Sequence, residues 1–478
     1  MKKKVYISVF ESESVADYAK VLAEKFDYEI VSSGKTLEFL RRKGLNVSDI
    51  EDMVLSDGFY RKSSIENLVK ENLDMIIVML QSVDDIAEKT DDIRQFTEAL
   101  NISDFAILRT GAKYFENTIV VTDVNDFYGA INVNPYERQL LALKAFQYLA
   151  DYDCAVSEKI GVYSGEDERK LFSWSKLYDL KYGSNPQQKA ALYKSDVMAD
   201  YIILNENELS HNDILNVTTA VNLVSEFYDV NAVSIVKHNL PCGVALGKSI
   251  FEAYTKAFDC DPFATFSGTI AFSQTVNFEV AKHLNSMSVK VVVAPYYDDD
   301  ALELLRKNGD LKIVRVTTAL KDFKNYITEE IDVTPFGILV QDANKSELDK
   351  DLFKVATKTK PTTEQLEDAI FAWKVAKYAR TNSVIIAKDF KTSAIVQGQV
   401  DLISATELAL DVACENSKDA VMAYDDPIET EECINAAAQG RISLIIEPGG
   451  AINDASIFET ADKFGIAVVV TGIRNLKF

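Results

Sequence analysis

The chain has 478 residues, of which 47% are hydrophobic and 26% charged, and its formal net charge is −23. At roughly 150 residues per domain, this length predicts about three domains, each long enough to bury a core. The acidic balance argues against binding to nucleic acid or to an anionic membrane, because both require a basic surface. An anionic ligand would need a few local cationic side chains and backbone N–H groups.

The five cysteines are scattered along the sequence without paired spacing, at Cys154, Cys242, Cys260, Cys414 and Cys433. This distribution favours a reducing compartment over a disulfide framework. The N-terminus leads directly into a strand pattern and lacks the apolar region of a signal peptide. No stretch approaches the roughly 18 apolar residues of a membrane span. We therefore expect a soluble, cytoplasmic protein.

The first third of the chain alternates strand and helix patterns. Strands are expected at Lys4–Val9, Tyr28–Ser32, Asp74–Leu80 and Thr118–Thr122, and helices at Ser14–Lys25 and Leu37–Lys43. Such alternation is typical of a parallel sheet with helices on both faces.

A short loop, Ser33-Gly34-Lys35-Thr36, joins the second strand to the helix that follows it. It is not a P-loop, because Glu29 stands where that motif requires its first glycine. Two interpretations stay open. The loop could hold a phosphate through the N–H groups at the helix N-terminus, or it could be an ordinary capped turn.

A charge-rich stretch around Val162–Trp174 predicts a connector between the first domain and the rest. Further strands and helices are expected at Thr218–Phe227, Ala232–Val236, Ile250–Phe258, Thr269–Phe272 and Lys290–Ala294. A capped helix beginning after Lys360 and running through Arg380 opens a third region. Its strands are expected at Ser383–Ala387, Ala420–Tyr424, Ile442–Ile446 and Ile466–Thr471.

The stretch Val233–Gly247 contains the strongest functional signal. It begins as an apolar strand, and Pro241 and Gly243 predict that the strand ends abruptly after Lys237 and His238. Neighbouring residues of a regular strand point to opposite faces, so this break would let both side chains share a site. The adjacent ammonium favours a neutral imidazole that can act as a base. The alternative is an ordinary surface Lys-His pair.

The segment Lys237–Ala245 is similar to the core motif of the transformylase that formylates aminoimidazole carboxamide ribonucleotide (AICAR). In bacteria this activity is usually fused to an N-terminal IMP cyclohydrolase. Further segments match the family in the expected order: Leu180–Gln188, Asp261–Phe266, Phe371–Lys377, Thr381–Asp389, Ile446–Gly450 and Thr471–Asn475. Several ordered motifs over roughly 300 residues are more specific than any single one.

The resemblance implies an α/β fold with an N-terminal methylglyoxal-synthase-like parallel-sheet domain and two cytidine-deaminase-like domains. We place these domains at residues 1–172, 173–360 and 361–478. The implied reaction moves a formyl group from 10-formyltetrahydrofolate to the AICAR amine, in a homodimer whose sites are completed across the interface. Free formate is an alternative formyl donor.

The resemblance also implies roles for individual residues. His238 would be the general base, and Lys237 and Asn382 would stabilise charge on the formyl oxygen. Lys181 and Arg474 would hold the 5′-phosphate. The remaining substrate-binding residues implied are Tyr182, Gly183, Phe266, Ser267 and Gln399.

No metal site is expected, although the fold resembles zinc deaminases. Ala245 stands where the second cysteine of the zinc motif would be, and none of the three histidines begins a His-x-Glu motif.

Several positions depart from the family pattern: Gln187 replaces a histidine, Leu402 an arginine, and Lys290 an acidic residue that contacts the nucleotide. These losses favour a rival interpretation, a degenerate paralogue that binds nucleotide or folate without turnover. The intact Lys237–His238 pair opposes it.

The N-terminal domain departs further. The family's Arg-Val-Lys signature would fall at residues 58–64 and is absent, its tyrosine is Gln81, and its aspartate is Asn101. Arg109 and Lys113 persist, so we expect a vestigial site of these two residues with Ser33–Thr36. We predict that cyclohydrolase activity is lost, with retention of both activities as the alternative.

Overall fold

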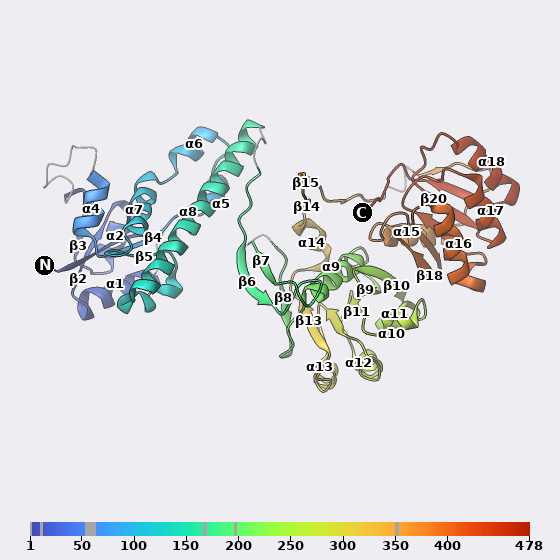
Figure 1. Ribbon diagram of the computed structural model, residues 1–478, viewed down its shortest axis with the longest axis horizontal. Coiled ribbons are helices and arrows are strands. Elements are labelled where there is room, and N and C mark those ends of the chain that lie inside the picture. Colours follow the sequence, from blue (N-terminus) through green and yellow to red (C-terminus); the bar gives the residue numbers. More distant parts are fainter. Residues whose placement is uncertain (1, 10–12, 53–63, 166–169, 196–197, 349–352) are drawn as a thin grey trace. The chain divides into compact units, whose positions relative to one another are not determined.

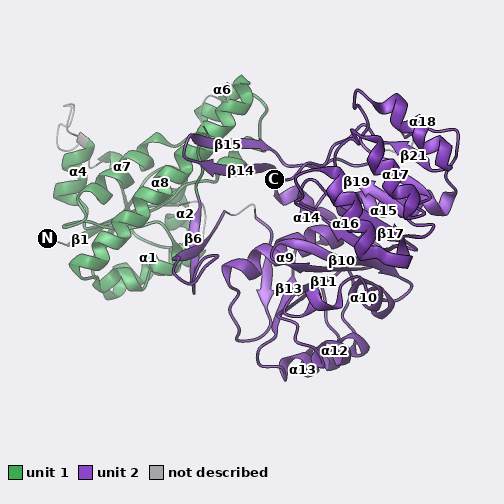
Figure 2. Ribbon diagram, turned by 45° about the vertical axis from the view of Figure 1, so that its right-hand side comes forward, with its two compact units in different colours: residues 1–173 green, residues 174–478 purple. Residues whose placement is uncertain are grey.

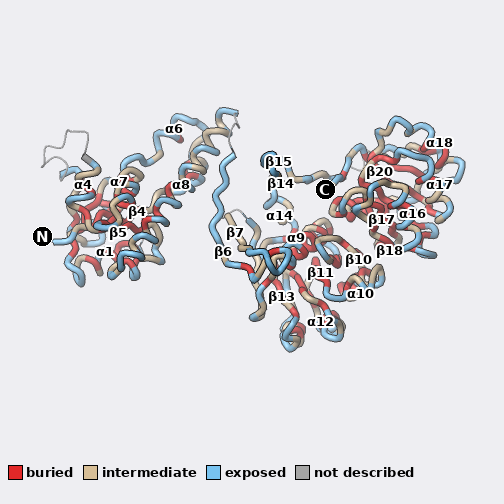
Figure 3. Tube along the Cα trace, in the orientation of Figure 1, coloured by how far each residue is buried: buried red, intermediate tan, exposed pale blue. Residues whose placement is uncertain are grey.

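The computed structural model describes residues 2–9, 13–52, 64–165, 170–195, 198–348 and 353–478. The chain forms two compact units, Met1–Ser173 and Trp174–Phe478 (Figure 2). The end of the first unit lies within the charge-rich stretch in which we place the first boundary. Each unit has its own sheet and its own buried cores (Figure 3).

The first unit is built on a five-stranded sheet in which every pairing is parallel. Its strands, in order across the sheet, are β3 (Val47–Asp49), β2 (Tyr28–Ser32), β1 (Lys3–Val9), β4 (Met75–Met79) and β5 (Ile119–Val121). Their side chains alternate between two cores, as the period of a strand dictates: Val5 and Ile7 face one core, and Tyr6 faces the other.

Helices cover both faces of this sheet (Figure 1). The helices on one face are α1 (Glu13–Lys25) and α2 (Gly34–Arg42). Those on the other are α4 (Ser64–Asn72), α7 (Ile102–Lys113) and α8 (Pro135–Ser164). The predicted parallel sheet with helices on both faces is therefore confirmed.

The second unit is built on a continuous twelve-stranded sheet. Its first half comprises β8 (Tyr201–Ile203), β9 (Asn231–Lys237), β10 (Leu240–Gly247), β11 (Thr269–Phe272), β12 (Val291–Ala294) and β13 (Lys312–Val316). Its second half comprises β16 (Lys354–Val355), β17 (Val384–Lys388), β18 (Lys391–Val396), β19 (Val421–Tyr424), β20 (Leu444–Glu447) and β21 (Ala467–Val470). The halves meet where β10 pairs with β18 through Ala245 and Lys391.

The two halves repeat one topology. Outward from the shared seam, the first runs β10-β9-β11-β12-β13-β8 and the second β18-β17-β19-β20-β21-β16. Parallel and antiparallel pairings follow in the same order in both halves. Because β10 and β18 are antiparallel, equivalent strand ends lie at opposite edges of the sheet.

The helices of the second unit follow the same repeat. One face of the sheet is covered by α9 (His211–Ser225) and α15 (Thr363–Ala376), which share a core. The other face is covered in the first half by α10 (Ile250–Phe258), α12 (Phe278–Asn285) and α13 (Asp299–Arg306). In the second half it is covered by α16 (Leu402–Ala413), α17 (Glu431–Gln439) and α18 (Asp454–Phe464).

Two small antiparallel sheets complete this unit: β6 (Ser175–Leu180) with β7 (Ala190–Lys194), and β14 (Glu329–Thr334) with β15 (Gly337–Asp342). The predicted α/β class is confirmed for both units.

One local expectation is wrong. The chain continues past Pro241 and Gly243 as strand β10, whose register shifts between these two residues. Gly243 is required there for space, because a Cβ would lie 2.2 Å from the carbonyl oxygen of Ala257 in α10. The break in the strand is instead the turn just before Leu240.

Candidate active site

His238 and Asn239 form the two-residue turn of the β9–β10 hairpin. Lys237 pairs with Leu240, and the φ angles of His238 and Asn239 are 56° and 63°. Positive φ at both positions defines a type I′ turn, whose twist matches that of the flanking strands. The turn places the His238 side chain outside the ladder, where it is exposed.

Helix α9 holds this turn from the neighbouring face of the sheet. The Asn239 N–H donates to Asn216 Oδ1 at 2.6 Å, and the Thr219 hydroxyl donates to Asn239 Oδ1 at 2.5 Å. Asn216 and Thr219 are buried. A left-handed turn of two non-glycine residues needs such support, because each costs about 1 kcal/mol or more.

Lys237 contacts a second turn next to the first. Its Nζ donates to the backbone oxygen of Phe266 at 2.8 Å. Ser267 follows with φ 60°, and its N–H donates to the Ser288 oxygen at 2.6 Å. The Phe266 side chain is exposed.

Asp213, on the first turn of α9, is completely buried between two lysines. Lys290 Nζ lies 2.8 Å from one carboxylate oxygen and Lys312 Nζ 2.5 Å from the other. Burial alone would raise the pKa of Asp213, but its hydrogen bonds with Lys290, Lys312 and Ser210 lower it to about 2. The carboxylate is therefore ionised at neutral pH.

These groups lie along one edge of the sheet, which we call the His238 edge. Val236 pairs with Thr269, Thr269 with Val291, and Val291 with Lys312. Lys237 follows Val236, and Lys290 precedes Val291. Because β9 runs antiparallel to β11 and β12, both lysines lie on the same side of this row of paired residues. Neighbouring strands are about 4.8 Å apart, so the Lys237 and Lys290 strands are about 10 Å apart.

The predicted residues Lys181, Tyr182 and Gly183 lie in the loop between β6 and β7. The next residue, Ser184, accepts a hydrogen bond from Asn212 Nδ2 at 3.2 Å through its backbone oxygen. The loop therefore lies against the N-terminus of α9. It comes within one helical turn of Asp213.

Asn382 and Gln399 lie at the same edge, in the second half of the sheet. The Asn382 side chain donates to the Gln399 backbone oxygen at 3.2 Å. Nearer the seam, Gln397 Nε2 donates to the Pro241 oxygen at 2.8 Å. The strand β17 after Asn382 is three positions from β9, about 14 Å away.

Arg474 lies still farther along this edge. Its Nε is 3.6 Å from Asp426 Oδ1, just beyond the end of β19. The C-terminal segment then crosses toward the seam, since Asn475 N donates to Asp425 O and Thr381 N to Lys477 O. Strand β19 is four positions from β9, about 19 Å away.

In the first unit, a buried carboxylate lies beside the predicted phosphate loop. Asp104 accepts hydrogen bonds from Tyr6 at 2.5 Å, from Ser8 at 2.6 Å and from the Asn101 amide. The Tyr6 hydroxyl is also 3.1 Å from Ser33 Oγ, and Ser33 makes no side-chain cap for α2. Burial, and next the charge of Asp104, raise the pKa of Tyr6 well above its usual value.

The other predicted residues of the first unit are dispersed. Gly34 and Lys35 are exposed, and Thr36 Oγ1 donates to the Val9 oxygen. Arg109 is exposed on α7, and Lys113, at the C-terminal end of α7, pairs with Glu66 at 2.7 Å. Lys113 is nine residues from Asp104, about 13 Å along the helix. Of the lost signature at residues 58–64, residues 58–63 lie outside the described residues.

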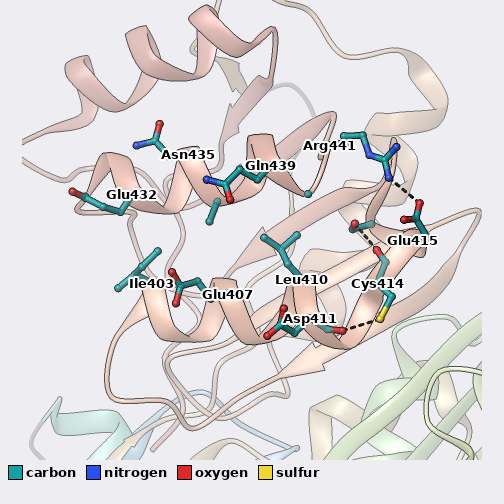
Figure 4. Close-up of a pocket in the computed structure, with 13 residues that line it drawn as sticks. Ile403, Glu407, Leu410, Asp411, Cys414, Glu415, Glu432, Asn435, Gln439 and Arg441 are labelled. Carbon is teal, nitrogen blue, oxygen red and sulfur yellow. Dashed lines mark hydrogen bonds and ion pairs between the residues drawn. The ribbon is translucent and has the colours of Figure 1, made fainter.

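A cavity of about 640 Å³ lies between α16 and α17, two of the helices that cover one face of the second half of the sheet (Figure 4). Its lining includes the carboxylates Glu407, Asp411, Glu415 and Glu432, and its arginine, Arg441, is paired with Glu415. None of the predicted site residues lines this cavity. Its negative charge is unsuited to a phosphate ligand.

Cys242 is unsuited to act as a nucleophile. Burial raises the pKa of its thiol to about 12, and the thiol donates to the Ile235 oxygen.

Within the described ranges, no group of three or more His, Cys, Asp or Glu side chains is placed to hold a metal ion. In the same ranges, no helix has the length and apolar character needed to cross a bilayer.

The sequence interpretation missed the residues that support the site. Asp213, Asn216 and Thr219 recur every three residues and form a buried polar stripe on α9. The detectable signal was this spacing of polar residues on a helix face that should be apolar.

The chain is similar to two family models, to curated proteins and to a solved structure. The family model described as "AICARFT/IMPCHase bienzyme" matches residues 111–412, and the "MGS-like domain" model matches residues 14–105. A "Bifunctional purine biosynthesis protein PurH" of Thermoanaerobacter sp. is 33% identical over 514 residues, covering both chains completely. Proteins of the same name from Clostridium botulinum and Petrotoga mobilis are 34% and 32% identical, also over both full lengths.

A solved structure titled "Crystal structure of ForH" covers 34% of this chain and 99% of its own, with 21% identity and a TM-score of 0.27, too low to carry an argument. The family model spans more than half of the chain, and the PurH proteins match it from end to end. The chain belongs to the AICARFT/IMPCHase bienzyme family of purine biosynthesis.

Proposed function

We propose that this protein is an AICAR formyltransferase that takes the formyl group from 10-formyltetrahydrofolate. The observation that carries the proposal is the turn at the His238 edge. It exposes His238, and the preceding residue, Lys237, donates its ammonium to the Phe266–Ser267 turn. The family of the chain supports this reaction class.

The chemistry needs a base at this place. The AICAR amine is conjugated with its ring and is a weak nucleophile, so it must lose a proton as it attacks the formyl carbon. His238 would accept that proton, a contribution of roughly 10²–10⁴ in rate. Lys237 lies on the same turn and would stabilise the negative charge that develops on the formyl oxygen. When the tetrahedral intermediate collapses, the bond between the formyl carbon and N10 breaks, N10 takes up the proton that His238 accepted, and tetrahydrofolate is released.

The repeated half of the sheet supplies an internal comparison for this assignment. The β17–β18 turn is also left-handed at both residues, Asp389 and Phe390, with φ of 53° and 54°. It presents a carboxylate and a phenyl ring where the first half presents His238 and Asn239. The backbone turn therefore does not require an imidazole.

The proposal is tested by turnover of purified protein with AICAR and 10-formyltetrahydrofolate. His238→Ala should lower kcat about 100-fold or more while AICAR binding survives. Asp389→Ala at the equivalent turn is the matched control and should leave kcat near that of the wild type. Near-normal turnover in His238→Ala would remove the assignment.

Asn382 and Arg474 suggest that two chains complete each site. Asn382 precedes β17, about 14 Å from the His238 strand, and Arg474 is paired with Asp426 at the end of β19, about 19 Å from that strand. Those distances are too long for direct contact with one formyl group and one phosphate held at His238. We therefore propose a homodimer in which the partner copy supplies these two residues.

The first unit is proposed to lack IMP cyclohydrolase activity. Asn101, at the position of the family's aspartate, uses its amide to hold Asp104 and to cap α7. Lys113 is paired with Glu66 at the opposite end of that helix. An asparagine cannot accept a proton near neutral pH, and catalytic groups that act as a unit lose most of their effect together.

A further inference from the structure

The ion cluster of Asp213, Lys290 and Lys312 carries a net positive charge. One buried carboxylate faces two ammonium groups, and Lys312 alone, at 2.5 Å, neutralises it. The side chain of Lys312 is 16% exposed and that of Lys290 is 40% exposed. The uncompensated charge is therefore accessible at Lys290, in a chain whose net charge is −23.

The repeat indicates that the fold itself does not require this cluster. Counted from the helix cap, Asp213 corresponds to Gln365 in the second half. By strand register, Lys290 corresponds to Ser443 and Lys312 to Ala467. None of these three residues is charged. The equivalent helix α15 is still capped, since Gln365 and Thr362 exchange hydrogen bonds like those between Asp213 and Ser210.

The cluster occurs at the edge that carries His238. Lys290 immediately precedes β12, and its N–H donates to the oxygen of Gly268, one residue after Ser267. The polar stripe of α9 joins the two places, because Asp213 holds Lys290 while Asn216 holds the His238 turn. Lys290 is two strands from His238, a separation on the scale of a nucleotide, about 10 Å.

We infer that Lys290 binds an anionic group of the substrates within the chain that supplies His238. The inference rests on the proposed function and deepens it. Two groups have the required chemistry: the 5′-phosphate of the nucleotide and the glutamate carboxylates of the folate. Lys181, on the loop against the same end of α9, lies on this side of the edge.

The test measures binding by calorimetry with the full-length protein, so it does not depend on turnover. The variants are Lys290→Ala and Lys290→Arg, with Lys307→Ala as the control, since Lys307 is an exposed lysine ion-paired to Glu303 on α13. Thermal unfolding verifies that each variant is folded. Lys312 remains to neutralise Asp213 in both Lys290 variants.

Each ligand is paired with an analogue that lacks the anion. AICAR is compared with its riboside, and tetrahydrofolate with the primary amide of tetrahydropteroate, in which an uncharged carboxamide replaces the link to glutamate. In Lys290→Ala, the affinity for AICAR or for tetrahydrofolate should fall about 10- to 100-fold, while its uncharged counterpart binds as before. Lys290→Arg should retain most of the affinity, and Lys307→Ala should match the wild type.

The outcome identifies the source of the anion. Selective loss of AICAR binding assigns the phosphate, and selective loss of tetrahydrofolate binding assigns the glutamate. Unchanged binding of both ligands, or equal loss for each ligand and its analogue, would overturn the inference. If the wild type binds these ligands but does not catalyse formyl transfer, the proposed function fails, while the binding measurements still decide the role of Lys290.

Discussion

Lys237 and Lys388 make the same hydrogen bond in the two halves of the sheet. Lys237 Nζ donates to the Phe266 oxygen at 2.8 Å, and Lys388 Nζ donates to the Lys418 oxygen at 3.2 Å. A lysine at this position therefore has a structural use wherever the topology occurs. Catalysis must be shown as an effect beyond that shared contact.

The two lysines form a matched pair for this purpose. Lys237→Ala and Lys388→Ala should lower stability by similar small amounts, because each removes one partly exposed hydrogen bond. Lys237→Ala should in addition lower kcat about 100-fold, whereas Lys388→Ala should not. Equal kcat values for the two variants would make Lys237 a structural residue.

Glu447 is a second residue whose role can be measured, through the dependence of stability on pH. It is completely buried, and burial raises the pKa of its carboxyl to about 7; one of its oxygens accepts from the Ile428 N–H. A folded-state pKa above the unfolded value means that the folded protein binds the extra proton. Glu447 therefore stabilises the fold most below about pH 4.5, and this contribution declines as the pH rises to about 7.

Glu447→Gln keeps the acceptor for Ile428 and removes the charge. The free energy of unfolding of the variant, relative to the wild type, should increase between pH 5 and pH 8 by on the order of 3 kcal/mol. Denaturant melts at several pH values measure this difference. A difference that does not vary with pH would mean that Glu447 titrates normally.

At the scale of elements, the polar stripe of α9 holds the turn that carries His238. Asn216→Ala leaves the Asn239 N–H without its acceptor and should destabilise the protein by roughly 1–3 kcal/mol. It should also lower kcat, because His238 shares the turn with Asn239. The α15 counterpart is Asp368, which accepts from Asp389 N and Phe390 N.

Asp368→Ala is therefore the control for Asn216→Ala. It should destabilise the unit by a comparable amount without changing kcat, because its turn carries no proposed catalytic group. Denaturant unfolding gives the stability, and steady-state kinetics gives kcat. A fall in kcat for both variants would mean that loss of stability alone accounts for the effect.

Most elements of the fold were predictable from sequence, and the exceptions have a physical cause. The strands at Tyr28–Ser32 and Thr269–Phe272 and the helix at Ile250–Phe258 have the predicted bounds, because their apolar patterns are unambiguous. Strand β10 was missed because Pro241 and Gly243 normally end strands. Here β10 pairs with β18 at Ala245, so the missing N–H of Pro241 lies outside that ladder.

The candidate site could be proposed from sequence only where a motif indicated it. Lys237 and His238 belong to such a motif, whereas Asn216 and Asp213 act through distant contacts that no local pattern reveals. The repeat was also hidden, because equivalent positions hold unlike residues, such as His238 and Asp389. Its backbone geometry persists after the side chains have diverged.

At the scale of the whole molecule, the proposed dimer predicts complementation between inactive variants. His238→Ala and Asn382→Ala should each be nearly inactive alone. When the two chains are mixed by co-expression, each mixed dimer has one intact site, so about a quarter of the wild-type activity should return. Mixtures that stay inactive would argue that each chain forms its site alone.

We predict that the first unit lacks IMP cyclohydrolase activity. Supplied with formyl-AICAR, the full-length protein should form IMP no faster than the spontaneous reaction, and Lys113→Ala should change nothing. Following IMP formation measures both. Protein-dependent IMP formation that Lys113→Ala abolishes would reveal a rearranged cyclohydrolase site.

The seam of the twelve-stranded sheet has a consequence for how the second unit can be divided. Each half is contiguous in sequence, and β10 and β18 are the strands that join them. A chain interrupted between β15 and β16 would leave every strand pairing of the large sheet intact within one fragment or across that seam. Two separately expressed fragments could therefore reassemble by joining their β10 and β18 edges. The second unit is therefore organised as two similar halves in tandem, of which only the first carries His238.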